Sequence, residues 1–407
     1  MKPWRPPNPE YAKRASLCIA QGALTNSKRP STLVEGVSPT HLVKGEGPYV
    51  FDTEGNRLID FISGLGSNLF GYGHGEITQA ICDRASKGAT LSLGTTLEIE
   101  VAEKVKELFP FVERMKFLKT GTQACSAAIK IARAYTGRSI VVSDGYHGHD
   151  DDFVSLTEPA LGVPPRTWMR KLTKEKLEPD SVAAVIIEAV NLDTSKEYLD
   201  WLRELRKECS RVGTLLIFDE IITGMRFPKF SVANWSGVEP DIICLGKAMG
   251  NGMPISCVAG REKIMNCGEY FISSTFAGET LSLAAALKVM TLLQMPKYDI
   301  QDLWDKGKSF QDRFNQMMPE KLILKGYPTR SIFEGDQMTK ALFWQEAVKA
   351  GILLGPSFFF NFSHRGLEDT VLNAFDDIFT RIKMSQVKLH GKVPQSPFAQ
   401  QMREKKP

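Results

Sequence analysis

The feature that most constrains the fold is a series of short apolar runs that alternate with helical patterns between residues 95 and 290. The runs "SIVVSD", "VAAVIIEAV" and "TLLIFDEI" are rich in β-branched residues, which is typical of parallel strands buried on both faces. The segment "YLDWLRELRKECSRVG", which separates the last two runs, has the apolar spacing of a helix. This alternation predicts an α/β fold with a mostly parallel central sheet, because parallel strands need long crossovers.

The pattern differs on either side of this region. On the N-terminal side, "YVFD" and "RLIDF" indicate two strands joined by a turn at residues 54–56. Beyond residue 295, weaker strands accompany helical patterns, which indicates a smaller α+β domain. The expected divisions are an N-terminal segment that packs with the small domain (1–64), a large domain (65–295), a small C-terminal domain (296–385) and a polar, basic tail (386–407).

Charge and composition exclude several classes of partner. The 51 basic and 47 acidic residues give a net charge of +4, which is too balanced to indicate a nucleic-acid or membrane surface. No apolar run approaches the ~20 residues that span a bilayer, and the N-terminal residues lack the apolar core of a signal peptide. The seven scattered cysteines form no CxxC pair, and "HGH" at 147–149 has no second ligand cluster. We therefore expect a soluble, cytoplasmic protein without a metal site.

Lys247 stands directly after an apolar run, in the stretch "PDIICLGKAMGNGMP". The dipeptide "GK" would suit a phosphate-binding P-loop, but Ala248 replaces the required Ser or Thr and Asp241 replaces the earlier glycine. Two interpretations remain. Lys247 is either an ordinary residue at a strand end or an amine with a lowered pKa that forms Schiff bases with carbonyl compounds.

Two carboxylates end apolar strands in the same way. Asp219 closes "LLIFD", with Glu220 after it, and Glu188 closes "AAVIIE". The carboxyl ends of parallel strands meet at one edge of a sheet, where α/β proteins bind ligands. Such acids could bind a metal, a ribose or a protonated ring nitrogen, and a helix cap is the structural alternative for each.

Two further stretches could contact a ligand. Thr120, Gly121 and Thr122 precede the helical pattern "ACSAAIKIARAYTG", and backbone N–H groups at a helix N-terminus bind anions such as phosphate. A plain N-cap is the alternative for the threonines. Tyr146 and His147 follow the strand "SIVVS" and could offer a ring face to a flat ligand.

Together these features fit pyridoxal 5′-phosphate (PLP). This cofactor needs an amine for its aldehyde, an acid for its pyridine nitrogen, an anion site for its phosphate and a contact for its flat ring. The sequence supplies the amine at Lys247, the acid at Asp219, the anion site at Gly121 and Thr122, and the ring contact at Tyr146.

The chain resembles the class III PLP-dependent aminotransferases. Within them it looks most like the glutamate-1-semialdehyde aminomutase branch. The matching stretches, in order along the chain, are "FDTEGNRLIDF", "TGTQACSAAIKIARAYTGR", "GYHGHDD", "AAVIIEAV", "IFDEIITGMRF", "PDIICLGKAMGNGMPI" and "STFAGETLSLAAAL". The resemblance implies the PLP-dependent transferase fold type I, which is the aspartate aminotransferase-like fold.

The resemblance also implies roles for the residues at the centre of the site. Lys247 would form the Schiff base with PLP, and Asp219 would pair with the protonated pyridine nitrogen, keeping the ring an electron sink. Gly121 and Thr122 would hold the phosphate.

Further roles follow from the same resemblance. Ile221 would pack on one face of the ring and Tyr146 on the other. Glu188 matches an acid at a strand end near the site. Thr275 resembles a threonine that family members lend to the phosphate of the neighbouring subunit, which implies a homodimer with shared active sites.

The chain departs from the aminomutase branch where the substrate is bound. That branch carries an arginine after an "SP" dipeptide to grip the substrate carboxylate, whereas Thr40 and His41 occupy this region here. In "SGLGSN", Leu65 replaces an aromatic residue, and Ser67 and Asn68 offer hydrogen bonds. His41, Ser67 and Asn68 are therefore the candidate substrate residues.

The expected function is amino-group transfer between a small-molecule amino donor and a carbonyl acceptor, with the substrate unidentified. The alternatives are an intramolecular amino transfer of the glutamate-1-semialdehyde type, a PLP-dependent decarboxylation, and a non-catalytic homologue that only binds a cofactor or partner. Retention of Lys247, Asp219 and the phosphate-binding residues argues against the last.

Overall fold

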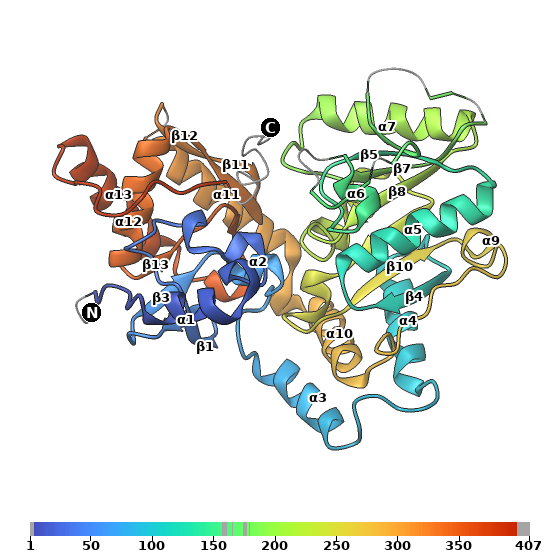
Figure 1. Cartoon of the computed structure of the whole chain (residues 1–407), viewed down its shortest axis with the longest axis horizontal. Coiled ribbons are helices and arrows are strands. Elements are labelled where there is room, and N and C mark those ends of the chain that lie inside the picture. The colour runs from blue at the N-terminus through green and yellow to red at the C-terminus, as the bar shows by residue number, and fades with distance from the viewer. Residues whose placement is uncertain are drawn as a thin grey trace. The chain divides into compact units, whose positions relative to one another are not determined.

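The computed structural model describes residues 4–156, 161–164, 166–173, 177–178, 180–318 and 320–396. Contacts between Cα atoms divide the chain into two compact units. One runs from Gly75 to Gln301, and the other combines the chain up to His74 with the chain from Asp302 onward (Figure 1). The sequence analysis places its divisions at 64/65 and 295/296, and much of its basic tail, from residue 397 onward, lies outside the described residues.

The unit Gly75–Gln301 is built on a central sheet whose described strands have the order β4-β10-β9-β8-β7-β5-β6. The strands are β4 (Arg114–Leu118), β5 (Ile140–Asp144), β6 (Met169–Lys171), β7 (Val182–Glu188), β8 (Leu215–Glu220), β9 (Ile242–Leu245) and β10 (Ser256–Gly260). Neighbouring strands pair in parallel except at β10, which is antiparallel to both β4 and β9. The predicted α/β fold with a mostly parallel sheet is confirmed.

Two long helices cover this sheet. Figure 1 shows β5, β7 and β8 between α7 (Lys196–Arg211) and α5 (Gly121–Thr136). Helix α5 packs on β7, β9 and β10, and small residues such as Ala124, Ala128 and Ala132 are fully buried in this contact. Small side chains let the helix backbone approach the strands closely. The helix ends at Gly137, whose left-handed conformation is the usual helix stop.

The same unit contains a second group of helices, in which α10 (Thr280–Leu293) packs on α3 (Gly75–Ala85) and α4 (Thr96–Leu108). Short helices complete the unit: α6 (Asp151–Val154), α8 (Val232–Ser236), α9 (Glu262–Met265), η4 (Pro228–Phe230), η5 (Lys247–Gly250) and η6 (Pro296–Tyr298). Helix α10 is apolar nearly all round, which is typical of a buried helix.

The other unit contains two small sheets. One has the order β1-β2-β3-β13, formed by β1 (Leu42–Glu46), β2 (Tyr49–Asp52), β3 (Arg57–Asp60) and β13 (Ile352–Leu353). The other has the order β11-β12-β14, formed by β11 (Leu322–Tyr327), β12 (Arg330–Gly335) and β14 (Phe358–Phe359). The predicted pair of N-terminal strands is confirmed as the antiparallel pair β2 and β3.

Helices and a cluster of phenylalanines complete this unit. The helices are α1 (Glu10–Cys18), α2 (Ser63–Gly66), α11 (Ile300–Met317), α12 (Gln337–Lys349), α13 (Glu368–Lys383), η1 (Ala20–Gly22), η2 (Asn26–Lys28), η3 (Pro30–Thr32) and η7 (Phe362–His364). Phe314, Phe343 and Phe379 are fully buried, and the rings of Phe343 and Phe379 stack with centroids 4.6 Å apart. Among the described helices, none is long and apolar enough to cross a membrane.

Candidate active site

The carboxyl ends of three neighbouring parallel strands bring the predicted acids and the lysine to one edge of the central sheet. Glu188 at the end of β7 pairs in register with Asp219 of β8, and Asp219 pairs with Cys244 of β9. Lys247 follows the end of β9 by two residues. Residues that are distant in the sequence therefore share an edge because the strands run in the same direction.

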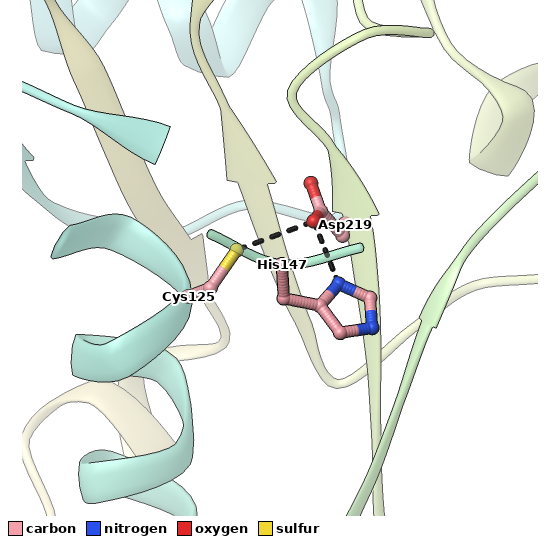
Figure 2. Close-up of side chains that lie close together, drawn as sticks. All are labelled: Cys125, His147 and Asp219. Atoms are coloured by element: carbon pink, nitrogen blue, oxygen red, sulfur yellow. Dashed lines mark hydrogen bonds and ion pairs between the residues drawn. The ribbon is translucent and has the colours of Figure 1, made fainter. Parts of the chain in front are cut away.

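Asp219 is held by three donors from different elements, two of which, His147 and Cys125, are drawn in Figure 2. Its Oδ2 atom accepts hydrogen bonds from His147 Nδ1 at 2.7 Å and from Cys125 Sγ at 3.3 Å, and its Oδ1 atom accepts one from the Ile221 backbone amide at 3.0 Å. The carboxylate is buried, with 5% of its side chain exposed. These contacts fix the orientation of the carboxylate and compensate for its burial.

His147 is a buried cation beside Asp219. Its Nδ1 atom faces the Asp219 carboxylate, and its Nε2 atom faces the backbone oxygen of Asp144 at 3.0 Å. Both partners are acceptors, so both ring nitrogens donate, which requires the imidazolium form. Burial alone would lower the pKa of His147, but the hydrogen bond to Asp219, with a smaller contribution from Cys125, raises it to about 10.

The residues of the predicted anion site lie at the start of helix α5. Thr120 is the N-cap, and its hydroxyl accepts a hydrogen bond from the Gln123 amide at 3.2 Å, which is the structural role considered for it. The hydroxyl of Thr122 lies 3.3 Å from both the backbone nitrogen and the Nδ1 atom of His149. The first amides of a helix have no partner inside the helix and carry the positive end of its dipole, so they favour an anion.

Ile221 connects the anion site to the lysine. A Cβ atom on Gly121 would lie 2.9 Å from the Ile221 side chain, and one on Gly246 would lie 3.0 Å from it. The isoleucine therefore packs between the first residue of α5 and the residue before Lys247. Its backbone amide also binds Asp219, so one residue sets the spacing of three parts of the site.

Lys247 has an unusual backbone conformation. Its φ of +41° lies in the left-handed region, and the half-buried side chain follows the extended Gly246. A non-glycine residue in such a conformation costs about 1–3 kcal/mol, and such residues concentrate at functional sites. The strain is consistent with a lysine placed for chemistry rather than with an ordinary strand end.

Glu188 and Tyr146 are linked. The Tyr146 amide donates to Glu188 Oε1 at 2.7 Å, so the acid fixes the loop that carries the tyrosine. Tyr146 is 56% exposed, and burial, followed by the charge of Asp219, raises its pKa. Thr275 is exposed on the surface of the same unit, near a turn in which the Ala277 amide donates to the oxygen of Ser274.

The three candidate substrate residues belong to the other unit. His41 lies with its Nδ1 atom 3.0 Å from the Thr40 hydroxyl, and the Ser67 hydroxyl donates to the Gly64 oxygen at 2.9 Å. Asn68 is buried and donates to the Ser63 oxygen at 3.4 Å. Their role in substrate binding stays a prediction.

The sequence analysis missed the two side chains that converge on Asp219. His147 was considered for a ring contact and, together with His149, for a metal site, but not as a partner of Asp219, although its position after a strand end was a usable signal. Cys125 lies among buried residues of α5, where nothing local distinguishes it from a packing residue. The ligand atoms of Cys125, His147 and Asp219 lie within 4.8 Å of one another, and the hydrogen bonds among them account for this proximity.

The residues at this edge fit PLP. An amine, a buried carboxylate beside a cation, and a helix N-terminus lie in one unit, and the Cβ contacts show that Gly121 could not carry a side chain without displacing Ile221. The family model described as aminotransferase class-III matches residues 34–166 and 165–356. The chain belongs to the class III aminotransferases. It is a PLP-dependent enzyme.

Individual relatives agree with this assignment. The class III enzyme is 30% identical to glutamate-1-semialdehyde 2,1-aminomutase of Desulfotalea psychrophila, over 82% of this chain and 88% of the relative. It is 32% identical to the Aquifex aeolicus protein of the same name, over 77% of this chain and 80% of the relative.

Solved structures show the same fold at lower identity. The FumI protein of Sphingopyxis sp. MTA144 has a TM-score of 0.84 at 21% identity, covering 94% of this chain and 98% of its own. An omega-transaminase from Sphaerobacter thermophilus has a TM-score of 0.80 at 21% identity, covering 92% and 97%. The expected fold type I is thereby confirmed.

Proposed function

We propose that this class III enzyme transfers an amino group between a small-molecule donor and a carbonyl acceptor, with Lys247 and Asp219 as its central residues. The observation that supports this most is Asp219, held beside the imidazolium of His147 at the same sheet edge as Lys247. The cationic neighbour compensates for the burial of the carboxylate, and a carboxylate is the partner that a protonated pyridine nitrogen needs.

Bound PLP supplies an aldehyde that condenses with amines and a ring that stabilises the carbanion formed next to the substrate nitrogen. Lys247 Nζ would hold the cofactor before substrate enters. Once released, it would take the proton from the substrate carbon and deliver it to the carbon that keeps the transferred amino group. Gly121 and Thr122 bind the phosphate at the start of α5. Ile221 and Tyr146 orient the ring, and Glu188 positions the Tyr146 loop.

A second candidate is intramolecular amino transfer. The named curated relatives are glutamate-1-semialdehyde 2,1-aminomutases, which favours this alternative. His41 stands in the region where the sequence analysis expects a carboxylate-binding arginine in that branch, which favours a different substrate. His41, Ser67 and Asn68 are proposed to contact it.

Assembly as a homodimer is part of the proposal. Two segments of the unit Gly75–Gln301 carry exposed apolar side chains: Leu91, Leu93 and Ile99 in the first, and Phe271 and Phe276 in the second. The chain just before the first segment is hydrogen-bonded to the chain just after the second, because Thr280 donates from its amide to the Ala89 oxygen at 2.8 Å and from its hydroxyl to the Gly88 oxygen at 2.9 Å. Thr275 lies within the second segment. Exposed apolar side chains favour burial against a partner subunit, to whose phosphate Thr275 would contribute.

A cytoplasmic location is proposed on the basis of the cysteines. All seven are free thiols in the structure, which fits a reducing compartment. Fractionation of cells that express a tagged chain tests this location.

The decisive experiment replaces Lys247 with alanine. We expect wild-type protein mixed with PLP to develop an absorbance band at about 420 nm that an amino donor bleaches, and Lys247→Ala to lose this band and at least about 1,000-fold of its multiple-turnover rate. Lys229→Ala, an exposed lysine of the same unit, serves as the control. Full multiple turnover by Lys247→Ala would exclude the assignment.

A donor and acceptor screen with mass measurement of the products separates the two candidate reactions. Amino transfer yields two products from two substrates, whereas the intramolecular reaction converts one substrate into an isomer of the same mass.

A further inference from the structure

The side chain of Cys125 makes a specific contact that the proposed function does not yet use. It projects from α5, which follows β4, toward the carboxylate at the end of β8 (Figure 2). The residue is fully buried, and its Sγ atom lies 3.3 Å from Asp219 Oδ2. The two residues are 94 positions apart in the sequence, so the contact is a product of the tertiary fold.

The hydrogen atom in this contact belongs to the thiol. Burial raises the pKa of Cys125 well above its usual range, and the adjacent Cys244 side chain and the charge of Asp219 raise it further. The protonated thiol is therefore the donor and the carboxylate the acceptor. Oδ2 receives two donors, one from Cys125 and one from His147, so both of its lone-pair positions are used.

Within the described part of the chain, the other carboxylate oxygen, Oδ1, has fewer donors than Oδ2. Among the described residues, the Ile221 amide is the donor recorded for Oδ1, and it occupies one of the two lone-pair positions. The remaining position on Oδ1 is available to a further donor. The distribution of donors thus distinguishes the two oxygens of a chemically symmetric carboxylate.

We propose that Cys125 is a positioning residue, whose thiol works with His147 to hold Oδ2 so that Asp219 presents Oδ1 to the pyridine nitrogen of PLP. This inference rests on the proposed function of Asp219. A thiol suits the task because it is a weak donor: it fixes the orientation of the carboxylate while withdrawing little of the negative charge that the pyridine nitrogen needs.

The first test uses the cofactor-free protein, so it is independent of turnover. Selective ¹⁵N-histidine labelling gives signals from six histidines, and His147→Asn identifies the His147 signal. Because both donors draw charge from the same oxygen, Cys125→Ala should strengthen the His147 hydrogen bond and move its Nδ1 proton downfield. Cys125→Ser introduces a stronger donor and should move that proton upfield.

Titratable groups around this centre include Asp219, Glu220, Tyr146 and the thiols of Cys125 and Cys244, so spectra are compared at one fixed pH. Cys257 provides the matched control, because it is an equally buried free thiol on β10 whose pKa is raised by burial alone. Cys257→Ala and Cys257→Ser should leave the His147 proton unchanged.

The second test uses the PLP-loaded enzyme. We expect Cys125→Ala to lower kcat roughly twofold to fivefold with little change in KM, because the weak hydrogen bond that orients the carboxylate is lost. Cys125→Ser should restore most of that loss. A packing role alone would make both variants comparably slow.

Opposite shifts of the His147 proton together with rescue by serine support the proposal. It is overturned if the proton shifts equally in the Cys125 and Cys257 variants, or if serine fails to rescue kcat. If the wild-type protein neither binds PLP nor transfers amino groups, the proposed function fails, and the histidine spectra still report separately on the Cys125 contact.

Discussion

At the scale of single residues, the site depends on a buried charge pair. Asp219 and His147 are both buried, and each ring nitrogen of the imidazolium donates to an acceptor. A buried pair is costly to break, because the partner left behind is an unpaired charge. The same pair contributes to the stability of the fold and fixes the orientation of the carboxylate that we propose binds the cofactor.

The pH dependence of stability provides a prediction at this scale. The pKa of His147 rises from 6.5 to about 10 on folding, so the folded state binds a proton that the unfolded state releases between these values. This contribution is fully present below pH 6.5 and is lost as the pH rises towards 10. We expect the free energy of unfolding, measured with urea in the cofactor-free protein, to fall across this range.

Two variants of His147 separate charge from hydrogen bonding. His147→Ala should cost roughly 3–5 kcal/mol near neutral pH, because it leaves Asp219 buried and unpaired. His147→Asn keeps a neutral donor and should cost less, but it should remove most of the decline in stability at alkaline pH. An undiminished decline in His147→Asn would contradict the assignment of the charge to this histidine.

At the scale of elements, the start of α5 and the loop after β5 are fitted to each other. Gly148 has a φ of +112°, and a Cβ atom there would lie 2.1 Å from the Thr122 hydroxyl oxygen and 2.8 Å from the Thr122 Cα atom. The loop can therefore approach the helix N-terminus only with glycine at this position. This contact brings His147 and the proposed phosphate site together.

Replacement of Gly148 tests that close approach. Gly148→Ala should destabilise the protein by at least about 3 kcal/mol and weaken PLP binding, because the new methyl group displaces Thr122. Gly137→Ala is the matched control at the other end of α5: its φ is +70° with no atom within 4 Å of the added Cβ, so we expect a cost of about 1 kcal/mol from backbone strain alone. Urea unfolding and PLP titration measure both effects. Equal losses in the two variants would argue against the steric explanation.

At the scale of the whole molecule, exposed apolar side chains support the proposed assembly. Phe271 is 84% exposed and Leu93 is 85% exposed, both in the unit that carries the central sheet. Large apolar side chains on a surface favour burial against a partner.

Sedimentation measurements test this assembly. Phe271→Asp should weaken the homodimer at least about tenfold, because a charge would be buried in the interface. Leu161→Asp changes an exposed leucine of the same unit that lies in neither apolar segment, and it should leave the dimer intact. A wild-type protein that remains monomeric at micromolar concentration would contradict the proposal.

The sequence alone determined much of the large unit. The apolar runs predicted β5, β7 and β8, since a strand buried on both faces needs apolar side chains at every position. The carboxylates at the ends of two of these runs and Lys247 after β9 were then expected at one edge, because parallel strands end together. The antiparallel strand β10 was not predicted, because its small residues in "SCVAG" carry no strong strand signal.

Only the tertiary structure decided how Asp219 is held. His147 and Cys125 lie 72 and 94 residues away from it, on a loop and on a helix. Sequence patterns report the local periodicity of helices and strands, and they carry no information on which distant side chains meet. The charge of His147, the donor role of Cys125 and the packing of Ile221 between two glycines therefore follow from how α5, β8 and β9 pack, which no single stretch of the chain encodes.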